Sequence, residues 1–82
     1  MFRQFQSLKG DHANAILFFR MGDFYEMFYD DAKEASGLLE LTLTARGKGT
    51  EHVVPMCGFP HHQVDAYAAR LVRAGRRVAI CE

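Results

Sequence analysis

Residues 16–28 read ILFFRMGDFYEMF, and this stretch decides the fold. Residues 16–19 are β-prone and apolar at every position, which predicts a central strand covered on both faces. Gly22 and Asp23 interrupt this run and predict a turn. From Tyr25 onward apolar residues recur at helical intervals, so a helix is expected to follow the turn.

The helix expected after Tyr25 has an apolar stripe and a charged face. The stripe consists of Phe28, Ala32, Ala35 and Leu39, and the charged face consists of Asp30, Asp31, Lys33 and Glu34. Asp23 lies where an N-cap would lie, and Glu26 follows three residues later, which is the pattern of a capping box. This interpretation places Phe24 and Glu26 in the exposed first turn of the helix.

The flanking segments predict further elements. Residues 2–9 have a short helical spacing before a polar break. Residues 41–45 and 53–57 predict the two strands of a hairpin joined by a flexible basic turn. Residues 58–60 are expected to end the second of these strands.

A second helix and a final strand complete the predicted fold. The apolar stripe of this helix is Val64, Tyr67, Ala68, Leu71 and Val72. Gly75 stops the helix, and residues 76–81 predict the last strand. The order is roughly α-β-α-β-β-α-β, which predicts an α/β (α+β) fold with a small mixed β-sheet packed with two to three helices.

The bulk properties limit the class of protein. The length allows one domain, residues 1–82, and because the chain ends directly on the last predicted strand we expect this domain to be truncated at its C-terminus. Residues 15–19 form the longest apolar run, far too short to span a bilayer, and no segment resembles a signal peptide, so a cytosolic protein is expected. Cys57 and Cys81 show no paired spacing and are expected to be free thiols in or near the core.

The charge balance limits any function that involves nucleic acid. Ten Lys and Arg residues balance ten Asp and Glu residues, so the formal net charge is zero. A neutral chain cannot gain a large affinity for DNA by releasing counterions. Such a chain must make specific contacts, or be held on its target by a partner.

Phe24 and Glu26 allow two interpretations on residue types alone. In the structural interpretation, the commoner one for such boxes, Phe24 packs onto the helix as a staple and Glu26 caps it. In the functional interpretation, both side chains project from an exposed turn toward a ligand. An aromatic residue is unusual there, because Asp, Ser or Thr would suffice for capping.

Other residues invite a function less strongly. Arg46 and Lys48, with two glycines, resemble a loop that binds backbone phosphates, and a solvated turn explains them equally well. Met21 and Met56 would be unremarkable as core methionines. The dipole of the second helix accounts for the late cations, Arg70, Arg73, Arg76 and Arg77.

Metal binding and catalysis find little support. Adjacent histidines at a helix start, such as His61 and His62, point in different directions, and no Cys or carboxylate lies at ligand spacing. A nuclease centre would need a Glu-x-Lys sequence on a strand next to Asp23 and Glu26, and no such sequence follows them. The chain also lacks a phosphate-binding Gly-Lys-Ser/Thr loop. We therefore expect no catalytic residues and no metal ligands.

Four blocks of the sequence resemble the opening domain of bacterial MutS proteins. These blocks are residues 17–32, 43–47, 54–62 and 78–82, and they occur in the order of that family. The motif that contacts mismatches in the family is Phe-x-Glu, which falls on residues 24–26. The chain is thereby identified as similar to the mismatch-recognition domain (domain I) of the MutS DNA mismatch-repair family.

The resemblance implies a function for individual residues. Phe24 would insert at a mispair and stack on a base in kinked DNA, and Glu26 would hydrogen-bond the mispaired base. Contacts to the DNA backbone or to the bases at the edge of the mispair would come from Met21, Asp23, Arg46, Lys48 and Met56. The expected partner is double-stranded DNA with mispairs or small insertion/deletion loops.

The resemblance also implies what lies outside this chain. The remaining MutS domains and a second subunit would be partners, and ATP and Mg would bind in the parent protein rather than here. The expected location is the bacterial cytoplasm, in association with the nucleoid and not with a membrane. Two alternatives remain open: a protein-interaction module that uses Phe24 as an exposed anchor, and, more weakly, a nuclease-like enzyme.

Overall fold

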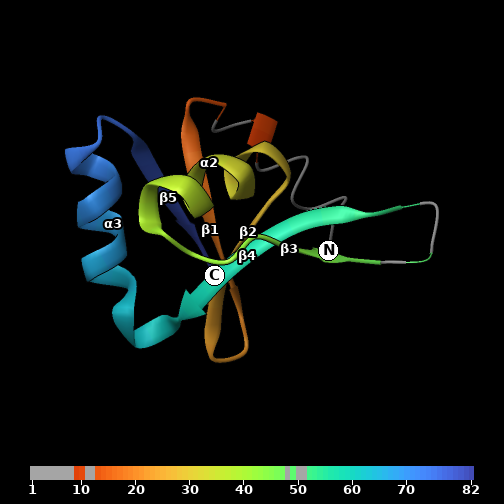
Figure 1. Ribbon diagram of the computed structural model, residues 1–82. Coiled ribbons are helices and arrows are strands. Elements are labelled where there is room, and N and C mark those ends of the chain that lie inside the picture. The colour runs from red at the N-terminus through yellow and green to blue at the C-terminus, as the bar shows by residue number, and fades with distance from the viewer. Residues whose placement is uncertain (1–8, 11–12, 48, 50–51) are drawn as a thin grey trace.

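The computed structural model describes residues 9–10, 13–47, 49 and 52–82. Five strands form one sheet in the spatial order β3-β4-β2-β1-β5, and two helices pack beside it (Figure 1). In chain order the elements are β1 (Ala15–Met21), β2 (Phe24–Phe28), α2 (Tyr29–Leu39), β3 (Thr44–Arg46), β4 (Val54–Pro60), the 3-10 turn η1 (His61–Gln63), α3 (Val64–Arg73) and β5 (Arg77–Cys81). The predicted fold class, a small mixed sheet packed with helices, is confirmed.

The sheet is mixed because β1 pairs antiparallel with β2 and parallel with β5. β4 lies antiparallel to both β2 and β3. β1 therefore has a neighbour on each side, and its residues 15–19 are all buried. This confirms the predicted central strand with two covered faces, because Ile16 and Phe18 belong to one apolar cluster and Leu17 and Phe19 to another.

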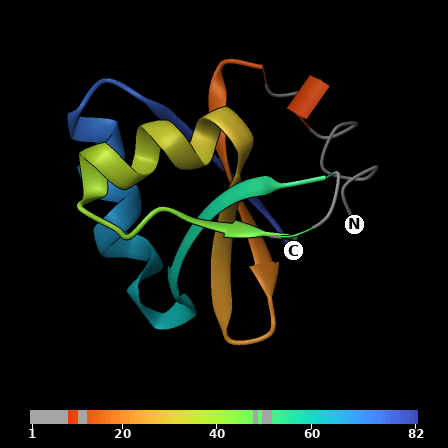
Figure 2. The same cartoon turned by 45° about the vertical axis from the view of Figure 1, so that its right-hand side comes forward.

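The two helices cover one face of the sheet (Figure 2). The larger cluster joins Phe18 of β1 and Phe59 of β4 to Ala32 and Leu39 of α2 and Leu71 of α3. The rings of Phe18 and Phe59 meet edge to face with centroids 5.0 Å apart, a favoured aromatic geometry. Of the stripe predicted for this helix, Ala32, Ala35 and Leu39 are confirmed, whereas Phe28 is wrong because it lies in β2 and packs in the smaller cluster. We call the face that packs on α2 and α3 the helix face, and the other face, on which neither of these two helices packs, the open face.

The helix expected from Tyr25 onward is wrong at its start. Residues 24–28 form a strand, and α2 begins only at Tyr29. Phe28 precedes the helix in extended conformation, and Tyr29 turns the chain with a φ of 57°. The predicted capping box of Asp23 and Glu26 is therefore also wrong, because both residues lie before the end of β2 and so cannot cap a helix that begins at Tyr29. Hydrogen bonding to β1 on one side and β4 on the other outweighs the local helical pattern.

Other boundaries shift as well. The hairpin strand expected at residues 41–45 is the shorter β3, and its partner β4 continues through residues 58–60, which were expected to end it. The second helix and the last strand lie where they were predicted. In the expected helix at residues 2–9, only Lys9 lies within the described residues, where it is helical.

Asp31 was placed on the charged face of the helix, and this is wrong. Its side chain is buried, with a relative exposure of 5% for the residue. The backbone N–H of Leu17 donates to one carboxylate oxygen at 3.2 Å, and the ammonium of Lys9 lies 2.8 Å from the other. The residue escapes the usual cost of a buried charge because both oxygens have donors.

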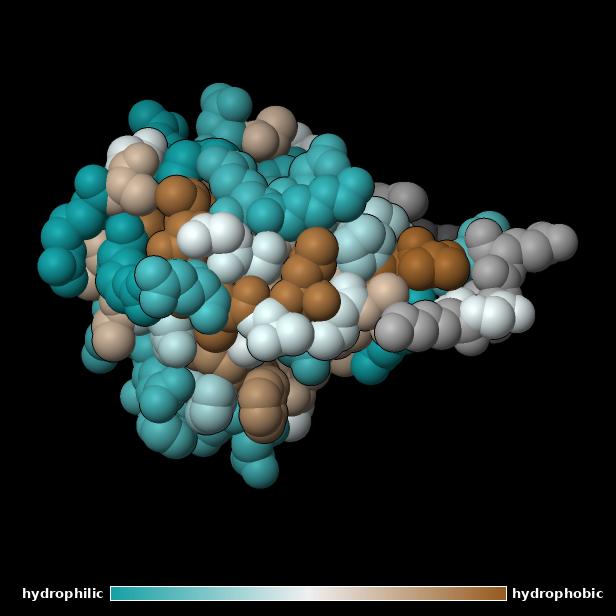
Figure 3. All heavy atoms as spheres, viewed as in Figure 1, coloured by the Kyte–Doolittle hydropathy of each residue, from teal (hydrophilic) through white to brown (hydrophobic). Residues whose placement is uncertain are grey.

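The remaining surface is ordinary for a small protein. Exposed apolar residues are scattered over several elements, and in the view of Figure 3 polar side chains divide the apolar surface into separate areas. The cysteines are free, with Cys57 buried and Cys81 partly buried, as predicted. Among the described residues, no helix is long and apolar enough to cross a membrane.

Candidate functional site

The β1–β2 hairpin carries the candidate site at one end of the sheet. Its two-residue loop is Gly22-Asp23, and Met21 pairs with Phe24 across it. Gly22 has a φ of 61°, which suits the first position of a hairpin turn whose twist matches its strands. The Nε of Arg20 donates to the carbonyl of Gly22 at 2.5 Å, which braces the turn. The turn projects beyond the rest of the sheet (Figure 2).

Phe24 and Glu26 project from the same face of β2. Side chains alternate along a strand, so residues two apart share a face, about 6.6 Å apart along the strand. Tyr25 and Met27 are buried against the helices on the helix face. Phe24 and Glu26 therefore lie on the open face, where Phe24 remains 45% exposed. The predicted helix turn was expected to present Phe24 and Glu26 together, and β2 does so instead, with both side chains pointing from the same face.

Glu26 lies between two strands with very different neighbours. On β1 it is opposite Phe19, and on β4 it is opposite Gly58. An ideal Cβ on Gly58 would lie 3.2 Å from the Cγ of Glu26 and 2.8 Å from the carbonyl oxygen of Tyr25. The side chain of Glu26 therefore lies over the space that the glycine leaves.

The carboxylate of Glu26 is poorly solvated. Its Oε2 atom is buried and has no hydrogen-bond partner among the described residues. Burial raises the pKa of Glu26 above its ordinary value, and the positive charge of Arg46 opposes this rise. Since an unpaired buried acceptor costs free energy, the site favours either the protonated carboxyl or a donor brought by a ligand.

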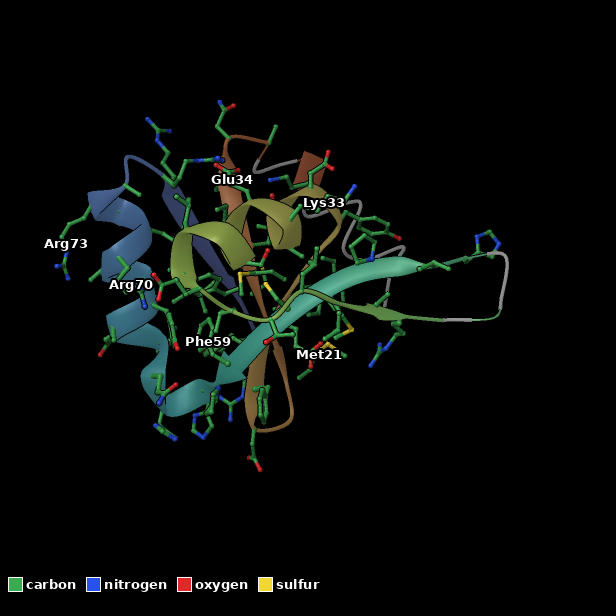
Figure 4. All side chains as sticks on the ribbon, in the orientation of Figure 1. Met21, Lys33, Glu34, Phe59, Arg70 and Arg73 are labelled. Carbon is green, nitrogen blue, oxygen red and sulfur yellow. The ribbon has the colours of Figure 1, made fainter. Side chains whose placement is uncertain are left out.

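Met21 and Met56 lie on the same open face. Both are half-buried and pack against the smaller cluster, which contains Leu17, Phe19, Phe28 and Val54. In Figure 4, Phe59 lies toward α3 and Met21 on the other side of the hairpin. Their core role is thus established by packing, and the register places them on the same face as Phe24 and Glu26.

The remaining predicted contacts lie at the edges of this face. Asp23 is exposed in the turn, and its carbonyl oxygen accepts a hydrogen bond from the backbone N–H of His61 at 2.8 Å. Arg46 is exposed at the end of β3, opposite Val54 of β4, which places it on the open face. Lys48 lies outside the described residues. Within the described part of the chain, no group of three or more His, Cys, Asp or Glu side chains could hold a metal ion.

Two comparisons with known proteins show the family of this chain. The family described as MutS domain I matches residues 1–82. The DNA mismatch repair protein MutS of Desulfatibacillum aliphaticivorans is 57% identical over 82 residues, which are 100% of this chain and 9% of that protein. The chain belongs to the MutS domain I family. It spans about a tenth of the length of this curated relative.

One residue of this candidate site, Gly58, was not singled out by its sequence pattern. Gly58 was expected to end a strand, whereas it lies inside β4 opposite Glu26. A glycine within a strand pattern is a signal for close approach of a neighbouring group. The identity of that group depends on strand register, which the sequence of β4 does not specify.

Proposed function

We propose that this MutS domain I is the mismatched-DNA-binding module of a mismatch-repair protein, and that Phe24 and Glu26 contact the mispair. The single observation that carries this proposal is the shared face of these two residues on β2, next to a projecting hairpin turn. An exposed aromatic ring and a recessed carboxyl on one rigid strand can approach one base pair together.

Phe24 supplies the contact that discriminates. An aromatic wedge entering the minor groove partly unstacks a base step and kinks the duplex, which costs a few kcal/mol per step. The cost is lowest where pairing is already faulty, so a mispair is the easiest place to insert. Because every base has a π face, one phenyl ring can serve many different mispairs.

Glu26 supplies the polar contact. Its Oε2 atom is buried without a partner among the described residues, and burial raises its pKa. Phosphate charge on nearby DNA would raise this pKa further, so the bound carboxyl would be protonated and could donate to a ring nitrogen of the displaced base. Phosphate or base-edge contacts from Met21, Asp23, Arg46, Lys48 and Met56 complete the proposed interface.

The rest of the parent protein supplies most of the affinity in this proposal. The chain has no net charge, so its own electrostatic attraction to DNA is small. By resemblance, ATP and Mg bind to distant domains of a dimeric protein in the bacterial cytoplasm, near the nucleoid. This module itself acts by binding and not by catalysis.

A chimera tests the proposal directly. This 82-residue sequence replaces the matched 82 residues of the D. aliphaticivorans relative, and Kd values are measured for matched, mispaired and insertion/deletion-loop duplexes, with and without Mg²⁺. We expect tighter binding to the faulty duplexes and no cleavage. Equal binding to all duplexes would contradict the proposal and favour a protein-interaction role for Phe24, and Mg²⁺-dependent cleavage would favour a nuclease.

A further inference from the structure

Gly58 faces Glu26 across the β2–β4 ladder, in the middle of both strands. An added Cβ on this glycine would meet other atoms within 4 Å, whereas one on Gly10, Gly22, Gly37, Gly49 or Gly75 would meet none. One of these atoms is the backbone carbonyl oxygen of Tyr25 at 2.8 Å, closer than real Cβ atoms come. Another is the Cγ of Glu26 at 3.2 Å. Atoms of β2, above all those of Glu26, therefore occupy the space that a side chain at position 58 would need.

We infer that Gly58 is a positioning residue for mispair discrimination, because the space above it holds the Glu26 side chain in its recessed position on the open face. This inference rests on the proposed function and deepens it. A methyl group at position 58 would push the Cγ of Glu26 outward and force β2 away from β4 at Tyr25. The carboxyl of Glu26 would then no longer lie at the depth from which it can contact the base on which Phe24, two residues away, stacks.

The backbone at Gly58 does not itself demand glycine. The glycines with a φ in the left-handed region are Gly22, Gly47, Gly49 and Gly75, so Gly58 is not required for conformational freedom. Its role is to provide space. Gly37 provides a matched control, because it also lacks a positive φ and an added Cβ there would meet nothing within 4 Å.

A double-mutant cycle in the chimera tests the inference. The readout is the ratio of the Kd for matched duplex to the Kd for mispaired duplex. We expect Gly58→Ala to lower this ratio about tenfold when Glu26 is present, the size of one lost hydrogen bond. In the Glu26→Ala background, where Phe24 still maintains a ratio above one, Gly58→Ala should have little effect. Gly37→Ala should change the ratio in neither background.

Two results would overturn the inference: an equal loss in both backgrounds, which means that Gly58 acts only through strand spacing, or no loss in either. If Gly58→Ala melts below the assay temperature, melting temperatures replace Kd values. Glu26→Ala must then recover part of the lost stability, since it removes the Cγ contact, and failure to recover it overturns the inference. A chimera without any mispair preference contradicts the proposed function instead, while the melting temperatures still test the Gly58–Glu26 contact.

Discussion

Phe24 and Glu26 stand on one face of β2 with opposite relations to solvent. Phe24 is 45% exposed, whereas the Oε2 atom of Glu26 is buried without a partner among the described residues. A strand holds this difference in depth more rigidly than a helix terminus would, because β1 and β4 pair with β2 on both sides. The arrangement separates a protruding apolar contact from a recessed polar one.

The first prediction concerns the protruding ring. Phe24→Ala in the chimera should remove the preference for mispaired duplex while weak binding to matched duplex remains. Stacking on a base contributes about 1–3 kcal/mol, so the Kd for mispaired DNA should rise roughly ten- to hundredfold. Because the side chain is exposed, the melting temperature of the protein should hardly change.

Leu38→Ala is the matched control for this substitution. Leu38 is also a large apolar side chain, 41% exposed, but it lies on α2. Its loss should leave both Kd values unchanged. Retention of the original preference by Phe24→Ala would assign the mispair contact to another residue.

The sequence predicted the fold class, β1 and most of both helical stripes, but not β2. Phe28 of the first stripe lies in β2, and Val72 of the second stripe is 61% exposed. Phe24 and Phe28 are spaced like the later helical positions, so the helical period could be continued back through them. The same five residues also alternate, with Phe24 and Glu26 on one face and Tyr25 and Met27 on the other. Period alone cannot separate a short strand from a helical turn here, and pairing with β4, far away in sequence, decides the outcome.

The candidate site shows the same limit. Residue types and family resemblance singled out Phe24 and Glu26, and the structure places both on one face of β2. The role of Gly58 depends on the β2–β4 register, and the burial of Asp31 depends on where α2 docks against β1. Both are long-range properties, so no local pattern predicts them.

A second prediction concerns Asp31, which ties α2 to β1. Asp31→Ala should destabilise the chain by about 3 kcal/mol, since it leaves the N–H of Leu17 without its acceptor and Lys9 without its carboxylate. Chemical denaturation of the 82-residue chain measures the change. The neighbouring Asp30 is the control, because its exposed side chain makes only a 3.9 Å ion pair with Lys33. Asp30→Ala should cost less than about 0.5 kcal/mol, and equal losses for both variants would contradict the role of Asp31.

A third prediction concerns the thiol of Cys57. Burial, and secondarily the charge of Glu26, raise its pKa to about 11. At pH 8 only about one thiol in a thousand would be ionised, so alkylation in the folded state should be slow and become fast on unfolding. Glu26→Gln removes one cause and should lower the pKa of Cys57. The pH dependence of alkylation, followed by mass spectrometry, checks both points.

Cys81 is the internal control for that experiment. Burial alone raises its pKa, so its alkylation profile should be the same with Glu26 or Gln at position 26. If Glu26→Gln also leaves the alkylation profile of Cys57 unchanged, the charge of Glu26 does not raise the pKa of the Cys57 thiol.

A fourth prediction concerns the pH dependence of stability. Because burial raises the pKa of Glu26 above 4.5 in the folded chain, the native state binds more protons than the unfolded state between the ordinary and the raised value. Stability from this group is therefore present at low pH and is lost as pH rises through that window. Glu26→Gln should stabilise the chain at pH 7 by up to about 1 kcal/mol, and the gain should shrink toward pH 4. A gain that is independent of pH would contradict this origin.

The same substitution makes the fifth prediction, which concerns DNA. Glu26→Gln retains a donor and removes a negative charge that phosphates repel, so the chimera should bind DNA at least as tightly as before. The gain should be largest on matched duplex, because matched DNA offers no displaced base with which the carboxyl could form a hydrogen bond. Discrimination between the two duplexes should therefore fall while affinity for both rises.

Glu40→Gln, which removes an exposed carboxylate at the end of α2, controls for the change in net charge. Kd values for mispaired and matched duplex at two salt concentrations separate local from long-range effects. If Glu26→Gln weakened both duplexes equally, Glu26 would act by holding β2 in place rather than by contacting the mispair.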